Sequence, residues 1–221
     1  MSSHQQILES FNFTNWGLID YQECEAKQLA LLDQIHQSES PGTLVLCSHP
    51  EVVTLGRSSE ASDIINWTGP TYEVNRGGRA TYHGPEQIVI YCLINLKFPG
   101  AQRKAKDIPD LLRCIEKSCI ELLATLGISA EGKSKTNSDL NDTGVWVSGK
   151  KIMSLGIAVR HWVSYHGLAF NFENNPNAFA GINPCGFHQS KMTSLQSLTE
   201  GLPLRSEIEN NLCQILAQNL F

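Results

Sequence analysis

Cys185 is the residue of this chain most suited to covalent chemistry. It lies in Asn183-Pro184-Cys185-Gly186, a loop bounded by proline and glycine, whereas most of the other cysteines lie in apolar segments: 47, 92, 114 and 119. A thiol in a loop can meet a substrate, and as a thiolate it can accept an acyl group and hold it as a thioester. The alternative is an inert loop cysteine, which is the more common fate of a single thiol.

A pair of lysines could assist such a thiol. Lys150 and Lys151 follow Gly149 and precede an apolar run from Ile152 to Val159. Desolvation at the mouth of a buried strand disfavours an ammonium group, which suits a lysine to general-base work. The spacing does not choose between the two lysines, and a solvated pair of turn residues is the alternative.

A glycine-rich segment runs from Arg76 to Pro85, with the sequence Arg-Gly-Gly-Arg-Ala-Thr-Tyr-His-Gly-Pro. Its glycine pair allows the backbone to approach a ligand closely, and an arginine fork can hold an anion. The spacing matches neither a Walker loop nor a dinucleotide-binding loop. A flexible turn that enters a strand is the alternative.

The sequence does not favour a metal centre or a disulfide framework. His161 and His166 are five residues apart, so on one strand they would face opposite sides. The seven cysteines are odd in number and include no Cys-x-x-Cys pair. We therefore expect no metal, no cofactor and a reduced, cytoplasmic protein.

The remaining pattern predicts the elements that position these residues. We expect three helices. The first covers 21–37 and is capped by Asp20, and the second covers 108–126, with Pro109 in its first turn and Gly127 at its end. The third covers 207–219 and begins with a Ser206/Glu209 capping box. Strands are expected over 42–47, 52–55, 145–147, 152–159 and 164–172, with a hairpin turn over 148–151. Residues 82–96 form a further strand-rich block, in which 88–96 is almost wholly apolar. Few breaks separate these segments, so we predict one domain over 1–221, with a mixed, largely antiparallel sheet and helices beside it, an α+β fold.

Composition limits the partners. The 221 residues carry a net charge of −5, with a pI near 5.8, which argues against a broad nucleic-acid-binding surface. No stretch has the apolar length of a membrane span, and the start does not resemble a signal peptide. The clearest basic cluster is Arg103-Lys104-Ala105-Lys106, with Lys97 before it. It is either a docking patch for an acidic protein or a solvated loop.

Five short segments, taken in order, resemble the lipoyl(octanoyl) transferase family over about residues 15 to 205. They are Arg76-Gly-Gly-x-x-Thr-Tyr-His-Gly-Pro85, Gly144-Val-Trp-Val147, Lys151-Ile-x-Ser-Leu-Gly156, Tyr165-His-Gly-Leu-Ala169 and Asn183-Pro-Cys-Gly186. The resemblance implies a biotinyl/lipoyl transferase-type fold, related to biotin ligases and class II synthetases, over approximately residues 40–221. It also implies octanoyl transfer from acyl carrier protein to a lysine of lipoyl domains, in 2-oxoacid dehydrogenases and the glycine cleavage H protein.

The resemblance also assigns roles to residues. Cys185 falls on the acyl-thioester cysteine of the family, and Lys151 falls on the lysine that activates this thiol. The substrate-binding segments fall on Arg76, Gly77, Gly78, Arg79, Ala80, Thr81, Tyr82 and His83, on Ser154, Leu155 and Gly156, and on Gly167, Leu168 and Ala169. The small residues among them are expected to leave room for an eight-carbon tail.

The chain departs from the family pattern at two places. Glu86 stands where glycine is usual, and residues 174–179 replace a stretch like Asp-Leu-Ser-Pro-Phe. Two other functions fit parts of the pattern: an ATP-dependent lipoate or biotin ligase, which needs no cysteine, and a non-catalytic module that binds lipoyl domains.

Overall fold

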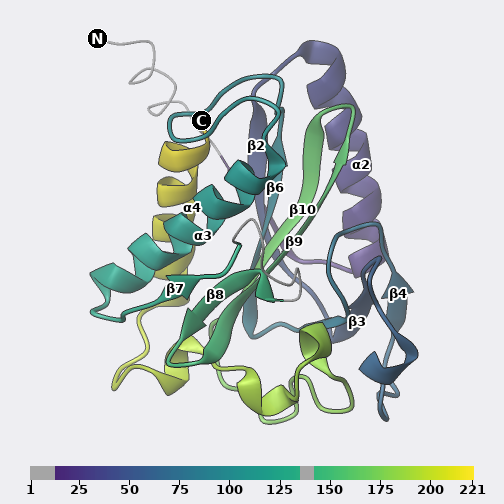
Figure 1. Cartoon of the computed structure of the whole chain (residues 1–221), viewed down its shortest axis with the longest axis vertical. Helices are drawn as coiled ribbons and strands as arrows, with labels where there is room; N and C mark the ends of the chain where they lie inside the picture. Colours follow the sequence, from purple (N-terminus) through teal and green to yellow (C-terminus); the bar gives the residue numbers. More distant parts are fainter. Residues whose placement is uncertain (1–12, 135–141) are drawn as a thin grey trace.

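A seven-stranded mixed sheet forms the centre of the protein, whose computed structural model describes residues 13–134 and 142–221. The strand order is β1-β2-β6-β10-β9-β8-β7, and only β1 and β2 are parallel. Helices α3 and α4 cover one face and α2 covers the other (Figure 1). The predicted α+β architecture is therefore confirmed. The strands are β1 Thr14–Leu18, β2 Gly42–Ser48, β6 Gln87–Ile94, β7 Glu131–Gly132, β8 Gly144–Val147, β9 Lys150–Arg160 and β10 Val163–Asn171, and the helices are α2 Tyr21–Ser38, α3 Ile108–Thr125 and α4 Arg205–Leu220.

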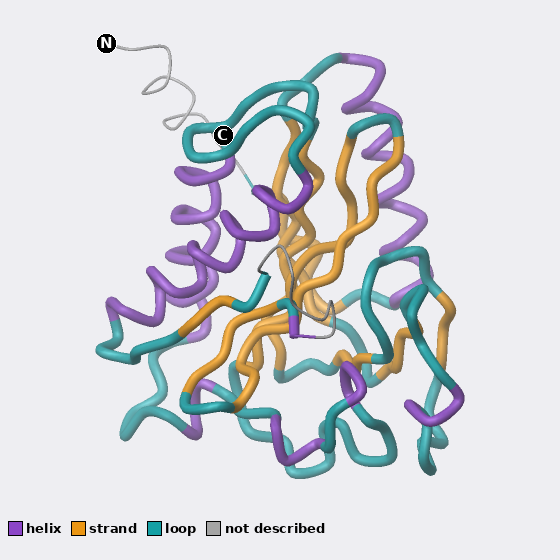
Figure 2. The backbone as a smooth tube through the Cα atoms, viewed as in Figure 1, coloured by secondary structure: helices purple, strands orange, loops and turns teal. Residues whose placement is uncertain are grey.

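A second, three-stranded sheet lies beside the first. It consists of β4 (Thr71–Glu73), β3 (Val52–Leu55) and β5 (Thr81–His83), in that order. Figure 2 shows that long loops with short helical turns gather at the same end of the molecule. The turns are η1 Ala61–Asp63, η3 Pro184–Gly186, η4 Gln189–Lys191 and η5 Leu195–Ser197. This end carries most of the residues that the sequence singles out.

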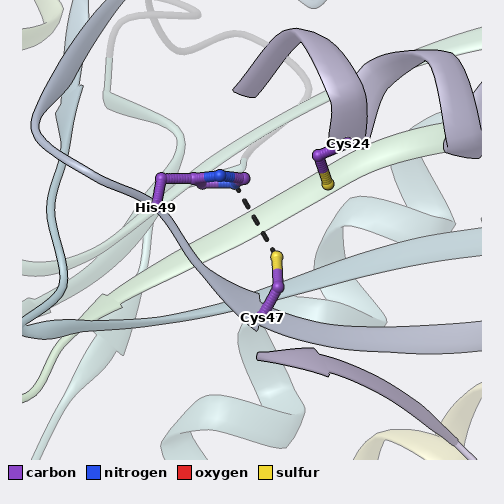
Figure 3. Close-up of side chains that lie close together, drawn as sticks. All are labelled: Cys24, Cys47 and His49. Carbon is purple, nitrogen blue, oxygen red and sulfur yellow. Dashed lines mark hydrogen bonds between the residues drawn. The ribbon is translucent and has the colours of Figure 1, made fainter. Parts of the chain in front are cut away.

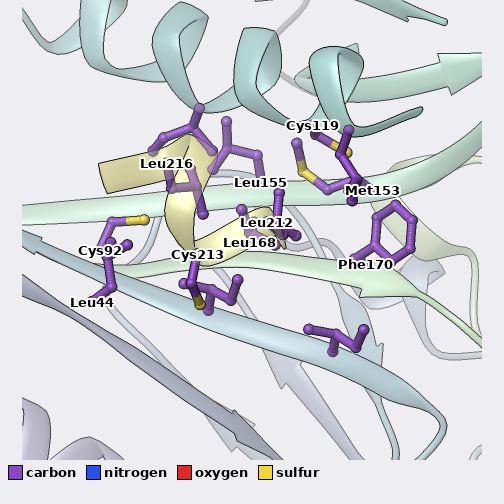
Figure 4. Close-up of a cluster of buried hydrophobic side chains, with 14 of the residues drawn as sticks. Leu44, Cys92, Cys119, Met153, Leu155, Leu168, Phe170, Leu212, Cys213 and Leu216 are labelled. Atoms are coloured by element: carbon purple, nitrogen blue, oxygen red, sulfur yellow. The ribbon is translucent and has the colours of Figure 1, made fainter. Parts of the chain in front are cut away.

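Strand β6 explains why the sheet is covered on both faces. All eight of its residues are buried. Ile88, Ile90, Cys92 and Ile94 face α3 and α4 in the larger apolar core, part of which is drawn in Figure 4. Val89, Tyr91 and Leu93 face α2 in the smaller core. A strand with two buried faces reads as one continuous apolar run, and that is the pattern of this segment.

Helix α4 begins differently from the expectation. The predicted capping box of Ser206 and Glu209 is wrong, because the helix starts at Arg205 and its N-cap, Leu204, makes no side-chain cap. Glu209 instead accepts a hydrogen bond from Arg205 Nε at 2.7 Å. The Arg205 guanidinium also donates to the backbone carbonyl oxygens of Pro85 and Gln87, so it ties the helix to the start of β6.

The predicted basic patch loses Arg103, whose side chain is buried. Its Nε donates to the carbonyl oxygen of Leu220 at 3.0 Å, and its Nη1 donates to that of Phe98 at 2.8 Å. Arg103 thus anchors the end of α4, and a docking role is wrong for this residue. Lys104 and Lys106 are exposed. Within the described residues, none of the helices has the length and apolar character needed to cross a membrane.

Candidate active site

A cavity of about 30 Å³ opens at the junction of the two sheets and holds the Cys185 side chain in its wall. Most of the predicted site residues line it: Arg76, Gly77, Gly78, Arg79, Thr81, His83, Ser154, Leu155, Gly156, Gly167, Leu168, Ala169 and Cys185. Segments separated by about 100 residues in the chain therefore meet at one place.

Strand pairing brings two of the predicted segments into line. Gly167 of β10 pairs with Gly156 of β9 on one side and with Tyr91 of β6 on the other. The next pairs along β9 and β10 are Leu155 with Leu168 and Ser154 with Ala169. The two motifs are thus adjacent rows of one antiparallel ladder.

Four residues of the cavity wall were not among the predicted site residues: Tyr21, Tyr91, Thr143 and His166. Tyr21 is the first residue of α2, so the N-terminal helix contributes directly to the site. Tyr91 lies in an apolar strand and shows no signal beyond its hydroxyl. His166 belongs to the motif Tyr165-His-Gly-Leu-Ala169, and its positive φ of 59° is the unusual feature of the strand.

Cys185 is held in a left-handed conformation, with φ 55° and ψ 22°. Its N–H donates to the carbonyl oxygen of Ala80 at 2.8 Å, which fixes the cysteine loop against the glycine-rich loop. Gly186 follows with φ 80°, and a Cβ there would lie 2.9 Å from Nη1 of Arg79. A non-glycine residue at positive φ persists only where its surroundings determine it, and this one carries the candidate nucleophile.

Asp63 holds these two loops together, and the sequence did not reveal it. The carboxylate is fully buried and accepts hydrogen bonds from Arg79 Nε at 2.9 Å and from the N–H of Glu60 at 3.1 Å. Its backbone carbonyl oxygen accepts the N–H of Asn183 at 2.8 Å. The hydrogen bond to Asp63 raises the pKa of Arg79. Asp63 lies 16 residues before Arg79, so no local pattern connects them.

Arg76 is buried and shapes the glycine-rich loop from inside. Its guanidinium donates to the carbonyl oxygens of Thr54 at 2.8 Å, Arg79 at 2.9 Å and Gly77 at 3.1 Å. Most of the fork is therefore engaged by backbone, although the side chain also lines the cavity. The fold therefore fixes the position of the Arg76 guanidinium, and its role in anion binding stays a prediction.

Three predicted residues, Ala80, Tyr82 and Lys151, lie outside the cavity wall. Ala80 is buried and contributes its carbonyl oxygen to Cys185. Tyr82 faces the opposite side of β5 from Thr81 and His83, and its ring packs on Phe179 with centroids 5.3 Å apart. Its hydroxyl donates to Glu51 at 3.2 Å. Burial raises the pKa of Tyr82, and the negative charge of Glu86 raises it further.

The hairpin register separates the two lysines. The turn consists of Ser148 and Gly149 at φ 48° and 77°, so both lysines belong to β9. Lys150 pairs with Val147 and is exposed, whereas Lys151 pairs with Trp146 and is fully buried. Successive residues of a strand face opposite sides, so only one of the two can enter the interior.

Lys151 lies beside the loop that carries Cys185. Its Nζ is 5.9 Å from the ring centroid of Phe187, two residues after the cysteine, and 5.2 Å from that of Trp146. Its carbonyl oxygen accepts the N–H of Thr193 at 3.0 Å. One of the two rings that flank the Lys151 amine therefore belongs to the cysteine loop.

The histidines near the cavity are neutral at pH 7. Burial, with help from His49 and Arg76, holds the pKa of His83 well below its usual range. Burial and then Arg76 lower the His166 pKa to about 3. His161 lies away from His166, in the turn between β9 and β10, and its ring stacks on that of His36 at 4.6 Å. These two histidines do not share a ligand site.

The lowered His166 pKa predicts a loss of stability in mild acid. The unfolded chain binds this proton below pH 6.5 and the folded chain does not until about pH 3, so the contribution is complete above 6.5 and is lost as pH falls. We expect the free energy of unfolding to fall by about 1.4 kcal/mol per pH unit from this residue. Urea unfolding at pH 7 and pH 5 measures it, and His166→Gln should lose less over this interval; an equal loss in the variant would contradict the assignment.

Gly167 permits close strand contact and does not simply leave space for a tail. A Cβ at this position would lie 2.1 Å from the carbonyl oxygen of Ile90 in β6. We therefore expect Gly167→Ala to lower the free energy of unfolding by about 1–3 kcal/mol, because β10 would be forced from β6. Gly201→Ala is the matched control, since a Cβ there meets no atom within 4 Å. Equal urea midpoints for the two variants would contradict the prediction.

Comparisons with known proteins identify the family. The family model of the lipoyl protein ligase A/B catalytic domain matches residues 20–216. An octanoyltransferase of Bdellovibrio bacteriovorus is 46% identical over 193 residues, which are 85% of this chain and 88% of that protein. An octanoyltransferase of Pelobacter propionicus is 36% identical over 191 residues, which are 85% and 84% of the two chains. The resemblance seen in the motifs is confirmed.

Solved structures show the same fold. A lipoate-protein ligase A bound with ATP has a TM-score of 0.68 at 16% identity and covers 95% of this chain and 84% of its own. A bipartite lipoate protein ligase of Thermoplasma acidophilum has a TM-score of 0.62 at 14% identity, with coverage of 95% and 84%. The biotin protein ligase of Aquifex aeolicus has a TM-score of 0.54 at 14% identity, with coverage of 95% and 69%. The expected relation to biotin and lipoate ligases holds at the level of fold.

Proposed function

Because the chain belongs to the lipoyl protein ligase A/B catalytic-domain family, we propose that it is an octanoyltransferase whose Cys185 carries the acyl group between donor and acceptor. The donor is octanoyl-acyl carrier protein, and the acceptors are lysines of lipoyl domains. The observation that carries the proposal is the placement of a half-buried loop thiol in the cavity wall, with a buried lysine beside the same loop. The catalytic unit includes α2, since Tyr21 lines the cavity.

In the first half-reaction, Lys151 takes the proton of the Cys185 thiol, and the thiolate attacks the thioester carbonyl carbon of the donor. A bond forms between Sγ and this carbon. The bond from the carbon to the carrier sulfur then breaks, and the carrier thiolate leaves with the proton that Lys151 took from Cys185, so Lys151 is neutral again. The donor is already a thioester, so the acyl group needs no activation by ATP.

The oxyanion formed in this step needs fixed donors. Among the candidate backbone groups, the N–H of Gly77 is bound to Ile157, that of Cys185 to Ala80 and that of Gly186 to Asn183. Within the described part of the chain, the N–H of Gly78 has no such partner, and Gly78 lines the cavity at φ 84°. Gly78 is therefore the backbone donor that we assign to the oxyanion.

In the second half-reaction, the acceptor lysine attacks the Cys185 thioester as a neutral amine. A free lysine is almost fully protonated near pH 7, so it first loses one proton to the solvent. A second proton must leave the nitrogen as the amide bond forms. Lys151 accepts it and returns it to the Cys185 sulfur when the amide has formed. The products are an octanoyl amide and the free thiol.

Mass spectrometry of the intact protein tests the proposal. After mixing with octanoyl carrier protein, we expect one octanoyl group on the wild-type protein and none on Cys185→Ala. Cys213→Ala is the control, because this thiol is buried in the α4 core, where burial raises its pKa to about 12. Modification of a lipoyl domain without any adduct, or an adduct in Cys185→Ala, would overturn the covalent mechanism.

The ATP-dependent ligases that share the fold provide the second candidate function. Free octanoate, ATP and magnesium discriminate the two reactions. Efficient modification of a lipoyl domain under these conditions by Cys185→Ala would favour a ligase. A non-catalytic module would bind the lipoyl domain and modify it under neither condition.

The free thiols support the proposal of a cytoplasmic location. All seven cysteines are free, including the nucleophile that the mechanism needs in reduced form. A reducing compartment preserves such a set, so we place the reaction in the cytoplasm.

A further inference from the structure

We propose that Cys24, Cys47 and His49 form a binding site for a zinc ion beneath the active-site cavity. The three residues come from α2, from β2 and from the loop after β2, and none of them lines the cavity that holds Cys185. Their donor atoms all lie within 4.8 Å of one another. In Figure 3 the two thiols point toward each other from the helix and the strand, with the imidazole ring beside them.

The distances are close to those of a tetrahedral zinc site. With zinc–sulfur bonds of about 2.3 Å and zinc–nitrogen bonds of about 2.0 Å, neighbouring donor atoms lie about 3.5 to 3.8 Å apart. Cys47 Sγ and His49 Nε2 are 3.7 Å apart. All the donor atoms lie within 4.8 Å of one another, so the site closes around an ion by a small inward shift, and the Tyr91 hydroxyl, 2.7 Å from His49 Nε2, must also turn away from that nitrogen.

The histidine already has the tautomer that a metal ligand needs. Its Nδ1 is 2.8 Å from the carbonyl oxygen of Ile19, and a carbonyl only accepts, so Nδ1 carries the proton. The lone pair is therefore on Nε2, which faces Cys47. A bound ring nitrogen with its partner nitrogen donating to a carbonyl is the usual outer-shell arrangement of zinc histidines.

Charge favours this ion in a buried place. The three residues are almost fully buried, and two thiolates with one neutral imidazole balance a doubly charged cation to zero. Binding releases one proton from each thiol to the solvent as the two sulfur–zinc bonds form. Soft thiolate and imidazole donors select zinc over magnesium or calcium.

Tyr91 is placed to supply the fourth ligand. The Tyr91 hydroxyl is 2.7 Å from His49 Nε2. It must turn away from the imidazole ring so that the lone pair of Nε2 can face the ion. Tyr91 and Tyr21 line the cavity, and Tyr21 packs on the His49 ring at 5.2 Å. An ion at this position would therefore fix the inner wall of the active site from behind.

Cobalt titration of the reduced, metal-free full chain tests the site. We expect one Co²⁺ per chain, a thiolate-to-cobalt absorption band in the near ultraviolet, displacement by one equivalent of Zn²⁺ and release of two protons. Cys24→Ser and Cys47→Ser should each weaken binding at least about 10-fold, since even an outer-shell partner contributes this much. Cys185→Ser and Cys213→Ser, whose thiols lie elsewhere, should bind as the wild type does.

The outcomes are decisive in either direction. No stoichiometric binding by the wild-type protein, or loss of the band in Cys185→Ser, would overturn the proposal, because the ion would be absent or at the catalytic thiol. Retention of the band in folded Cys24→Ser would do the same. If circular dichroism shows that a serine variant is unfolded, the number of protons that the wild-type protein releases on metal binding still tests the proposal. Release of fewer than two protons would exclude two thiolate ligands. The result is independent of acyl transfer.

Discussion

Lys151→Met is expected to slow both half-reactions by about 100- to 10,000-fold, the usual range for the loss of a general base. Methionine has a similar length and suits a buried site, so it removes the amine with little change in packing. Lys150→Met is the matched control. It removes the neighbouring lysine, which is exposed, and should leave the rates unchanged.

The two half-reactions can be measured separately. Formation of octanoyl-Cys185 is followed by mass spectrometry in a rapid-quench experiment, and transfer to a lipoyl domain is followed from the isolated thioester. Because Lys151 serves both steps, both rates should fall. Equal rates in Lys150→Met and Lys151→Met would contradict the role that we give to the buried lysine. Loss of the second rate alone would limit Lys151 to the acceptor amine.

Asp63→Asn should lower the free energy of unfolding by about 3 kcal/mol and also slow acylation. Removing one partner of a buried ion pair leaves the other uncompensated, which costs about 3–5 kcal/mol, and here Arg79 retains some contact with water. The asparagine keeps the shape but not the charge. Since the Asp63 carbonyl holds Asn183 and Arg79 packs on Gly186, the Cys185 loop should lose its fixed position.

Glu60→Gln provides the control for Asp63. Glu60 pairs with the same arginine at 2.9 Å, but its side chain is 63% exposed. A surface pair contributes about 0–1 kcal/mol, so this variant should unfold at nearly the wild-type urea concentration. An Asp63→Asn variant as stable as Glu60→Gln would refute the claim that Asp63 is the anchor. A destabilised variant with a normal acylation rate would separate stability from positioning.

The sequence by itself determined the elements whose signals are local. Asp20 caps α2 as expected, accepting from the N–H groups of Gln22 and Glu23, because a cap and its partners lie within one turn. The strand and helix periods place α3, β2, β3 and β10 within one or two residues of their predicted bounds. The ordered motifs also pointed to the family and to Cys185. Glycines, prolines and a loop thiol can be recognised within a short segment, because they do not depend on distant partners.

The tertiary structure alone decided the features that depend on distant partners. The motif match chose Lys151 over Lys150 without a physical reason, and the β8–β9 register supplies a physical difference, because it buries Lys151 beside the Phe187 loop and leaves Lys150 exposed. The sequence placed Arg103 in a surface patch, whereas in the structure its side chain donates to the carbonyl oxygen of Leu220 at the end of α4, over 100 residues later. Periodicity reports which face of an element is apolar, but it cannot report which buried charge on another segment will meet it, because that depends on how the elements pack.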